Sequence, residues 1–257
     1  MAEEIQTQKI NHLLKSWSKG AVFTSNYLEK KGFSAKLVNW YKSSGWLDSL
    51  GHGAYKRSGE TIEWYGGLSA LQAQMNLPVH PGGKTALELL GYAHYLSEQM
   101  REVQLFGRRE NRLPQWFKKY DWKVSVNYYP TNLFPIDLKG SFTDYNHKEI
   151  KIRISSPERA ALEMLYLVPQ EQGFDEASHI TENLTTLRPE LVQKLLENCN
   201  SIKAKRLFLH LAEKHNHDWF EQLVLSNVDL GTGKRVIVKG GKLDKKYEIV
   251  VPQERDY

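Results

Sequence analysis

Basic and polar side chains able to contact nucleic acid are concentrated in one segment of this 257-residue chain, from Lys30 to Arg57. The segment holds six basic residues and one acid, Asp48, whereas the chain from residue 61 onward holds 26 basic and 25 acidic residues. Lysine and arginine neutralise phosphates, and serine and asparagine hydrogen-bond to base edges. The pattern therefore predicts DNA binding through Lys30, Lys31, Ser34, Lys36, Asn39, Trp40, Lys42, Ser43, His52, Lys56 and Arg57.

These side chains divide into two kinds of contact, because phosphate contacts set the register of a protein on DNA and base contacts set its sequence preference. We assign to phosphates Lys30, Lys31, Lys56 and Arg57, and to positions at or near base edges Ser34, Lys36, Asn39, Trp40, Lys42 and Ser43. Asn39 can pair bidentately with an adenine, which is worth about 1–3 kcal/mol of discrimination. Trp40 lies near the inner face of its expected helix and suits a core position equally well. His52 fits either a minor groove or a solvated turn.

Two short helices and a hairpin are expected to position these side chains. Serine and threonine at the starts, and glycine at the ends, are the residue types that cap helices. The expected elements are a helix from Thr24 to Gly32, a second helix from Ser34 to Gly45, and a hairpin over residues 46–57 that turns at residues 51–53. This order builds a winged helix-turn-helix, a module whose second helix lies in a DNA major groove.

The rest of the chain mixes helical and extended patterns, which predicts an α+β protein in two parts. Residues 1–60 would form the winged helix-turn-helix, opened by a helix over residues 5–17, and residues 61–257 would form a larger, mixed α/β C-terminal domain. The expected helices span residues 61–75, 84–90, 156–167, 175–184, 189–198 and 202–215, and the expected strands span residues 103–106, 122–126 and 149–154. A final hairpin is expected from residues 236–238 and 247–251.

The composition is that of a cytoplasmic globular protein, with 40% hydrophobic and 25% charged residues. We expect no transmembrane helix, because the sequence has no run of about 18 apolar residues. The first residues are acidic and polar, which is unlike a signal peptide. The single cysteine, Cys199, is expected to be a small buried side chain rather than part of a disulfide or zinc site. We expect no cofactor and no bound metal.

A second basic stretch runs from Arg101 to Lys123, with seven basic and three acidic residues. Two interpretations stay open for it. The stretch can extend the DNA-binding surface, or it can be an ordinary exposed face of the protein.

The best enzymatic alternative is a metal-dependent nuclease built on Asp137, Glu149 and Lys151. An acid at a strand end followed by Glu-x-Lys on the next strand is an arrangement that can hold a divalent metal and orient water. Glu-x-Lys also suits an exposed strand face, so the pattern is weakly specific.

Two other motifs resemble catalytic or metal sites and are rejected on spacing. Gly83 and Lys84 match the end of a phosphate-binding loop, but the glycine required five positions before Gly83 is Pro78. His215 and His217 have tight spacing, but no third and fourth metal ligands follow them. No serine–histidine–acid arrangement is visible either, so an enzyme is not expected.

Several motifs together resemble those of AbiEi-type antitoxins. They are Gly32-Phe33-Ser34, Leu37 to Tyr41, Ser44 to Leu47, Gly51 to Tyr55, His80 to Gly91, Ser156 to Ala160 and the glycine-rich tail from Gly231 to Pro252. The resemblance covers nearly the whole chain, and several of these motifs are unusual enough to be fairly specific.

The resemblance implies two roles. The N-terminal winged helix would bind inverted repeats in double-stranded DNA of its own promoter and repress transcription. The C-terminal region would counteract a partner toxin with a nucleotidyltransferase-like fold, in a type IV toxin–antitoxin system for abortive infection, without necessarily forming a stable complex. Two alternatives stay open: the nuclease with an appended DNA-binding domain, and an adaptor whose winged helix binds protein.

Overall fold

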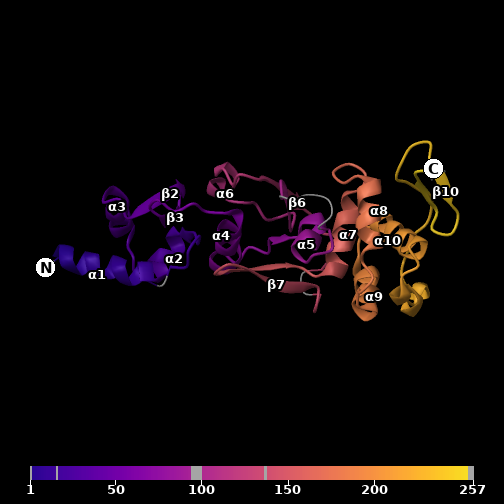
Figure 1. Cartoon of the computed structure of the whole chain (residues 1–257), viewed down its shortest axis with the longest axis horizontal. Helices are drawn as coiled ribbons and strands as arrows, with labels where there is room; N and C mark the ends of the chain where they lie inside the picture. The colour runs from indigo at the N-terminus through magenta and orange to yellow at the C-terminus, as the bar shows by residue number, and fades with distance from the viewer. Residues whose placement is uncertain (1, 16, 94–99, 136–137, 254–257) are drawn as a thin grey trace. The chain divides into compact units, whose positions relative to one another are not determined.

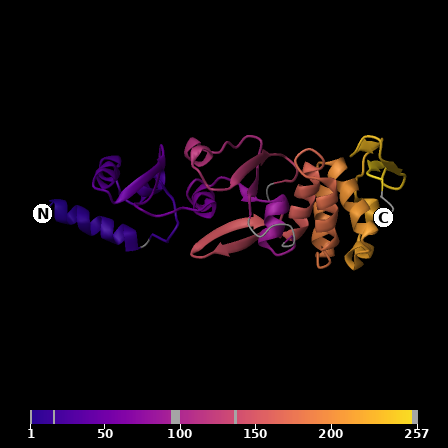
Figure 2. The same ribbon diagram turned by 45° about the horizontal axis from the view of Figure 1, so that its top comes forward.

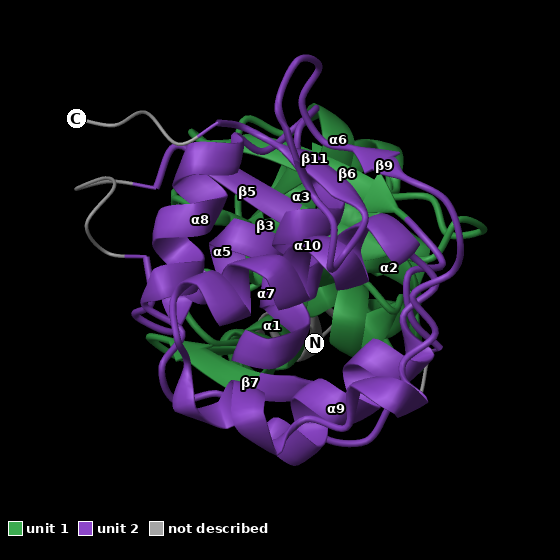
Figure 3. Ribbon diagram, turned by 90° about the vertical axis from the view of Figure 1, so that its right-hand side faces the viewer, with its two compact units in different colours: residues 1–80, 105–130, 144–153 green, residues 81–104, 131–143, 154–257 purple. Residues whose placement is uncertain are grey.

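The computed structural model describes residues 2–15, 17–93, 100–135 and 138–253, with the helices and strands labelled in Figure 1. Its contacts define two units (Figure 3): unit 1 comprises residues 1–80, 105–130 and 144–153, and unit 2 comprises residues 81–104, 131–143 and 154–257. With 41% helix and 19% strand, the α+β class is confirmed. The predicted domain boundary at residue 60 stays a prediction.

A winged helix opens unit 1. Its elements are α1 (Ala2–Lys15), β1 (Phe23–Thr24), α2 (Ser25–Lys30), α3 (Ala35–Ser43), β2 (Leu47–Gly51) and β3 (Ala54–Arg57). The three strands form one antiparallel sheet in the order β1-β3-β2. Thr24 and Ser34 cap α2 and α3, because each side-chain oxygen accepts a backbone N–H one turn into the helix, from Tyr27 and Leu37 respectively. The sequence predicted the Ser34 cap, and for α2 it left Thr24 and Ser25 as alternatives, of which the structure shows Thr24.

The apolar faces of these elements meet in a small core. It contains Ile10, Leu13, Trp17, Leu28, Phe33, Val38, Tyr41 and Leu47, all of which are buried. Two of them, Val38 and Tyr41, lie three residues apart on α3, so one face of that helix is committed to the core. The opposite face of α3 is left for another role.

A helix that changes from α to π geometry follows the winged helix. It comprises α4 (Trp64–Ser69) and a π-helical segment, Ala70–Gln74. Gln74 exchanges two hydrogen bonds with the backbone beside β1: it accepts from Thr24 N at 2.8 Å and donates to Val22 O at 2.7 Å. Gln72 does the same with Arg153 of β8 (Ile150–Ser155), accepting at 2.9 Å and donating at 2.8 Å.

Two further sheets complete the middle of the chain. One has the order β4-β5-β6, from β4 (His80–Pro81), β5 (Glu102–Gly107) and β6 (Ser125–Pro130), and the other pairs β7 (Phe142–His147) with β8. The strand expected over residues 122–126 was wrong in its position, because Lys123 has a φ of 62° and interrupts extended backbone there. Strand β7 and the helix α6 (Gln115–Lys119) were not predicted.

Helices make up most of unit 2. They are α5 (Gly83–Leu89), α7 (Pro157–Leu167), α8 (Phe174–Glu182), α9 (Pro189–Asn198) and α10 (Ile202–Lys214), followed by 3-10 turns at Asp218–Gln222 and Leu225–Asn227. Helices α7 to α10 lie side by side around a core of aliphatic residues (Figure 2). The sequence predicted all five helices to within two residues. Among the described helices, none combines the length and hydropathy required to cross a membrane.

A buried ion pair within α7 is hydrogen-bonded to the segments beside this helix. Glu163, whose exposed fraction is 1%, accepts hydrogen bonds from Arg159 Nε at 2.7 Å, the Ser155 hydroxyl at 2.7 Å and Gly83 N at 3.3 Å. Arg159 also lies over the ring of Phe142, with 4.4 Å between the guanidinium carbon and the ring centroid. The charges of Arg159 and Glu163 are therefore both paired inside the protein.

The described chain ends in a three-stranded sheet packed against α10. Its strands are β9 (Arg235–Val236), β10 (Lys242–Asp244) and β11 (Ile249–Val251), in the order β10-β11-β9. The hairpin expected from residues 236–238 and 247–251 was wrong, because β11 pairs antiparallel with β10 and parallel with β9. The glycine-rich segment between the two expected strands is therefore not a simple turn, because it contains a further strand, β10.

Candidate nucleic-acid interface

The outer face of α3 carries the polar residues on which the DNA-binding prediction depends. Lys36, Asn39 and Lys42 are all exposed, opposite the buried Val38 and Tyr41. The three residues follow one another at intervals of three positions, so each is rotated by about 60° from the one before and together they span about 120° of the helix circumference. This side presents two phosphate-binding groups and a group able to hydrogen-bond to an adenine.

The other three α3 candidates are already engaged within the protein. The Ser34 hydroxyl caps the helix, and the Ser43 hydroxyl donates to the Trp40 carbonyl at 2.9 Å. Trp40 is partly buried and packs against the core, with its ring centroid 5.4 Å from that of Tyr41. Of the two interpretations of Trp40, the structure favours a packing role with one edge exposed.

The last turn of α2 supplies two more exposed cations, Lys30 and Lys31. The Lys31 ammonium lies 5.6 Å from the centroid of the Tyr27 ring, and the Lys42 ammonium lies 6.0 Å from that of Tyr55. Such cation–π contacts at exposed sites leave the charge available to solvent or to a phosphate.

The wing presents His52 at its tip and Lys56 and Arg57 at its base. His52 is exposed in the turn between β2 and β3. Lys56 donates to the Glu60 carbonyl and lies 3.8 Å from an Asp48 carboxylate oxygen. Arg57 donates to the carbonyls at the end of α1 and just beyond it, those of Leu14 and Trp17, and its Nη1 lies 3.6 Å from Glu60 Oε1.

Lys56 and Arg57 thus hold the base of the wing to its surroundings. Their assignment to phosphates stays a prediction, but each charge already has partners inside unit 1.

Helix α6 packs beside the wing and carries two exposed lysines. The backbone of Gly51 in the wing faces Trp116 of α6, and a Cβ built at Gly51 would lie 2.9 Å from the Trp116 Cβ. Lys118 and Lys119 in the last turn of α6 are exposed. Sequence reasoning identified the basic stretch but missed this helix, for which Pro114 before a buried Trp-Phe pair was the available signal.

The structure describes two of the three nuclease candidates, Glu149 and Lys151. Asp137 lies outside the described residues. Glu149 accepts a hydrogen bond from Lys19 N at 3.1 Å, and Lys151 is paired with Asp144 at 2.7 Å. Glu149 and Lys151 therefore have structural partners on an exposed hairpin.

The other rejected motifs also have protein partners. The start of α5 is occupied by the Glu163 carboxylate, which accepts from Gly83 N. His215 shares a hydrogen bond with the Ser178 hydroxyl at 3.1 Å, and His217 with the Thr181 carbonyl at 2.8 Å. Within the described residues, no group of three or more His, Cys, Asp or Glu side chains could hold a metal ion.

Cys199 is buried in the core, as expected. Burial raises the pKa of its thiol to about 11. A thiol with this pKa is almost entirely protonated at neutral pH, so Cys199 is a packing residue.

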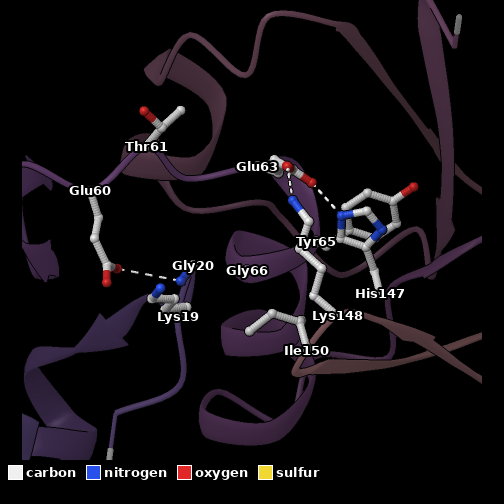
Figure 4. Close-up of a pocket in the computed structure, with 10 residues that line it drawn as sticks. All are labelled: Lys19, Gly20, Glu60, Thr61, Glu63, Tyr65, Gly66, His147, Lys148 and Ile150. Atoms are coloured by element: carbon white, nitrogen blue, oxygen red, sulfur yellow. Dashed lines mark hydrogen bonds and ion pairs between the residues drawn. The ribbon is translucent and has the colours of Figure 1, made fainter.

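A pocket of about 240 Å³ lies beside the winged helix in unit 1 (Figure 4). Its wall includes Glu63, which is bridged by Lys148 Nζ at 2.7 Å and His147 Nε2 at 2.5 Å. The hydrogen bond from Lys148 holds the pKa of Glu63 below its ordinary value. Glu60, across the pocket, accepts from Gly20 N at 3.3 Å. Both carboxylates are thus used to join three segments of the chain.

Tyr65 lines the same pocket, and its ring stacks on His147 with centroids 4.0 Å apart. Burial raises the pKa of its hydroxyl, so the side chain is a neutral phenol at physiological pH. Neither Tyr65 nor the two engaged carboxylates offers a nucleophile or a metal site.

Comparison with known proteins agrees with these features. A solved structure, that of the RV2827C protein from Mycobacterium tuberculosis, superimposes with a TM-score of 0.62 at 16% identity over 95% of this chain and 90% of that one, which establishes a shared fold. No protein of curated function matches significantly. The family model for the N-terminal domain of the AbiEi antitoxin transcriptional regulator matches residues 6–98, and the model for the AbiEi antitoxin of type IV toxin–antitoxin systems matches residues 100–252. The chain therefore belongs to the AbiEi family of antitoxins and transcriptional regulators.

Proposed function

We propose that this protein is an autorepressor that binds inverted repeats in its own promoter, with α3 in the major groove. The observation that carries the proposal is the exposed face of α3, where Lys36, Asn39 and Lys42 lie opposite the core residues. Family membership supports a regulatory role. The proposal adds the binding surface and the contacts made by each residue.

The contacts follow from position on the winged helix. Asn39 reads a base edge, while Lys36 and Lys42 bind phosphates on either side of it. Lys30, Lys31 and His52 extend the footprint along the backbone and into the adjacent groove. Lys118 and Lys119 of α6 add phosphate contacts beside the wing.

The second half of the proposal is antitoxicity. The region that matches the AbiEi antitoxin model, residues 100–252, counteracts a toxin with a nucleotidyltransferase-like fold. This role does not require a stable complex between the two proteins.

Binding of the full chain to its upstream promoter DNA, compared with scrambled DNA over a salt series, tests the DNA-binding half. We expect preference for the promoter, which Asn39→Ala removes at the cognate sites. Lys42→Ala should weaken binding to both DNAs. It should also make the negative slope of log K against log salt shallower by about 1, since one phosphate contact is lost.

Lys194→Ala provides the matched control, because Lys194 is an exposed helical lysine of unit 2. It should change neither the preference nor the slope. Equal affinity for promoter and scrambled DNA in the unmodified protein would contradict the proposal.

A further inference from the structure

The C-terminal sheet exposes an aliphatic side chain on each of its two edge strands, on the face turned away from the core of unit 2. Along β11, Ile249 and Val251 belong to the core of unit 2, whereas Val250 between them points to the other face. The register places Val250 next to Leu243 of β10 on one side and Val236 of β9 on the other. We call these three residues the aliphatic row. Its centre, Val250, is 8% exposed, and its two ends are 44% exposed at Leu243 and 51% exposed at Val236, so the accessible apolar surface lies at the ends.

The inner face of this sheet is held firmly on α10, the layer next to it in Figure 1. Arg206 of α10 is 2% exposed and donates to the carbonyls of Leu230, Gly231, Gly233 and Glu248 at 2.7–3.1 Å.

Two further contacts hold the β10–β11 turn on α10. His210 contacts Asp244 at 2.6 Å, and the Tyr247 hydroxyl donates to Glu213 at 3.0 Å. The sheet therefore has a fixed orientation, with the aliphatic row directed away from α10.

The rim of the aliphatic row is positively charged. Residues 234–248 include six basic and two acidic residues. Both acids have partners on α10: Asp244 lies against His210, and Glu248 lies 3.2 Å from Arg206 Nη2. The exposed lysines that flank the row are Lys234, Lys239 and Lys245, whereas Lys246 is paired with Glu213 of α10, and Lys242 lies opposite Val251 in the register, on the inner face. An apolar centre within a basic rim is complementary to an acidic surface that carries apolar side chains.

We propose that the aliphatic row and its rim dock an acidic segment of another protein. Aliphatic side chains in the segment would cover Val236 and Leu243, and its carboxylates would pair with the surrounding lysines. Nucleic acid is a poorer occupant, because single-stranded platforms stack bases on aromatic rings and the one aromatic residue of this sheet, Tyr247, is buried on the inner face. A membrane surface is also disfavoured, since tryptophan and tyrosine are the usual interfacial anchors.

Fluorescence anisotropy with a labelled peptide tests the proposal directly. The probe is a peptide of alternating glutamate and valine about ten residues long, the length of a long strand. The full chain should bind it, and Val236→Ser with Leu243→Ser should weaken binding at least about tenfold through loss of the apolar contact. Lys239→Glu with Lys245→Glu should weaken it by a similar factor.

Val224→Ser is the matched control, because Val224 is 50% exposed in unit 2 but lies outside the sheet. It should bind the peptide as the unmodified chain does. All variants should keep the promoter binding described above, so failure of this proposal and failure of the repressor proposal give different results.

Three outcomes would overturn the proposal. One is equal binding of a glutamate–serine peptide, which would leave the aliphatic row without a role. Another is peptide binding that neither double variant weakens. The third is binding of a DNA duplex or of phosphatidylglycerol vesicles that the Val236→Ser, Leu243→Ser variant abolishes, with no binding of the peptide.

Discussion

Charged residues have opposite roles in the winged helix and in the helical core of unit 2. On α3, Lys36 and Lys42 project to solvent. On α7, Arg159 and Glu163 are buried and bonded to each other at 2.7 Å. The difference means that only a charge that folding has left unpaired remains available for recognition. Sequence counts of basic residues do not make this distinction.

The same contrast exists within the winged helix, between a lysine of α3 and an arginine of the wing. Lys42 and Arg57 are both basic and close to the proposed DNA surface, but the Arg57 guanidinium is bonded to carbonyls at the end of α1. We therefore expect the two residues to respond differently to substitution, one in DNA affinity and the other in stability.

The largest effect is expected from Glu163→Ala. This change leaves the Arg159 charge buried and removes the acceptor for Ser155 and Gly83, which should lower the free energy of unfolding by about 3–5 kcal/mol. Urea unfolding followed by circular dichroism measures the loss.

Lys151→Ala breaks the exposed pair with Asp144 and serves as the comparison, with a change within about 0.5 kcal/mol. Equal losses in the two variants would remove the distinction between buried and exposed pairs.

A smaller loss is expected from Arg57→Ala. The variant leaves the carbonyls of Leu14 and Trp17 without their donor, at a cost of about 1–3 kcal/mol in unfolding free energy. Thermal unfolding should show the change, while the salt dependence of DNA binding should stay that of the unmodified chain. If the negative slope of log K against log salt became shallower while stability stayed unchanged, Arg57 would instead be a phosphate contact.

The smallest effect concerns His215. Burial lowers the pKa of its imidazole below the ordinary value, although Glu182 opposes the shift. The unfolded chain then takes up a proton at a higher pH than the folded chain, so the stability contributed by the neutral imidazole is complete above about pH 6.5 and is lost as pH falls.

Unfolding midpoints measured between about pH 5 and pH 7.5 should show a steeper decline for the unmodified chain than for His215→Gln. Parallel pH profiles for the two proteins would disprove the assignment.

Local signals were sufficient to predict most helices and the winged helix. Ser156 caps α7 and Pro157 follows it, as the sequence indicated, and Ser34 caps α3. Helix caps depend only on residues within one helical turn, so they can be recognised in the sequence before any tertiary structure is known.

Features that depend on contacts beyond a single helical turn were not predictable. Trp122 donates to the Phe117 carbonyl at 2.8 Å and packs beside α6, so its segment is a turn despite a strand-like composition. The pairing of β11 with two partners depends on Arg206, whose acceptors lie 24 to 42 residues further along the chain. The structural role of Arg57 likewise depends on carbonyls about 40 residues earlier.

The paired glutamines of the π-helical segment have a consequence for how the protein behaves when concentrated. β1 is the outer strand of its sheet, and β8 is paired on one side by β7. By donating to and accepting from these strands, Gln74 and Gln72 occupy backbone groups that a strand from a neighbouring molecule would otherwise engage. The π-helical segment thereby limits the pairing of β1 and β8 with strands of neighbouring molecules.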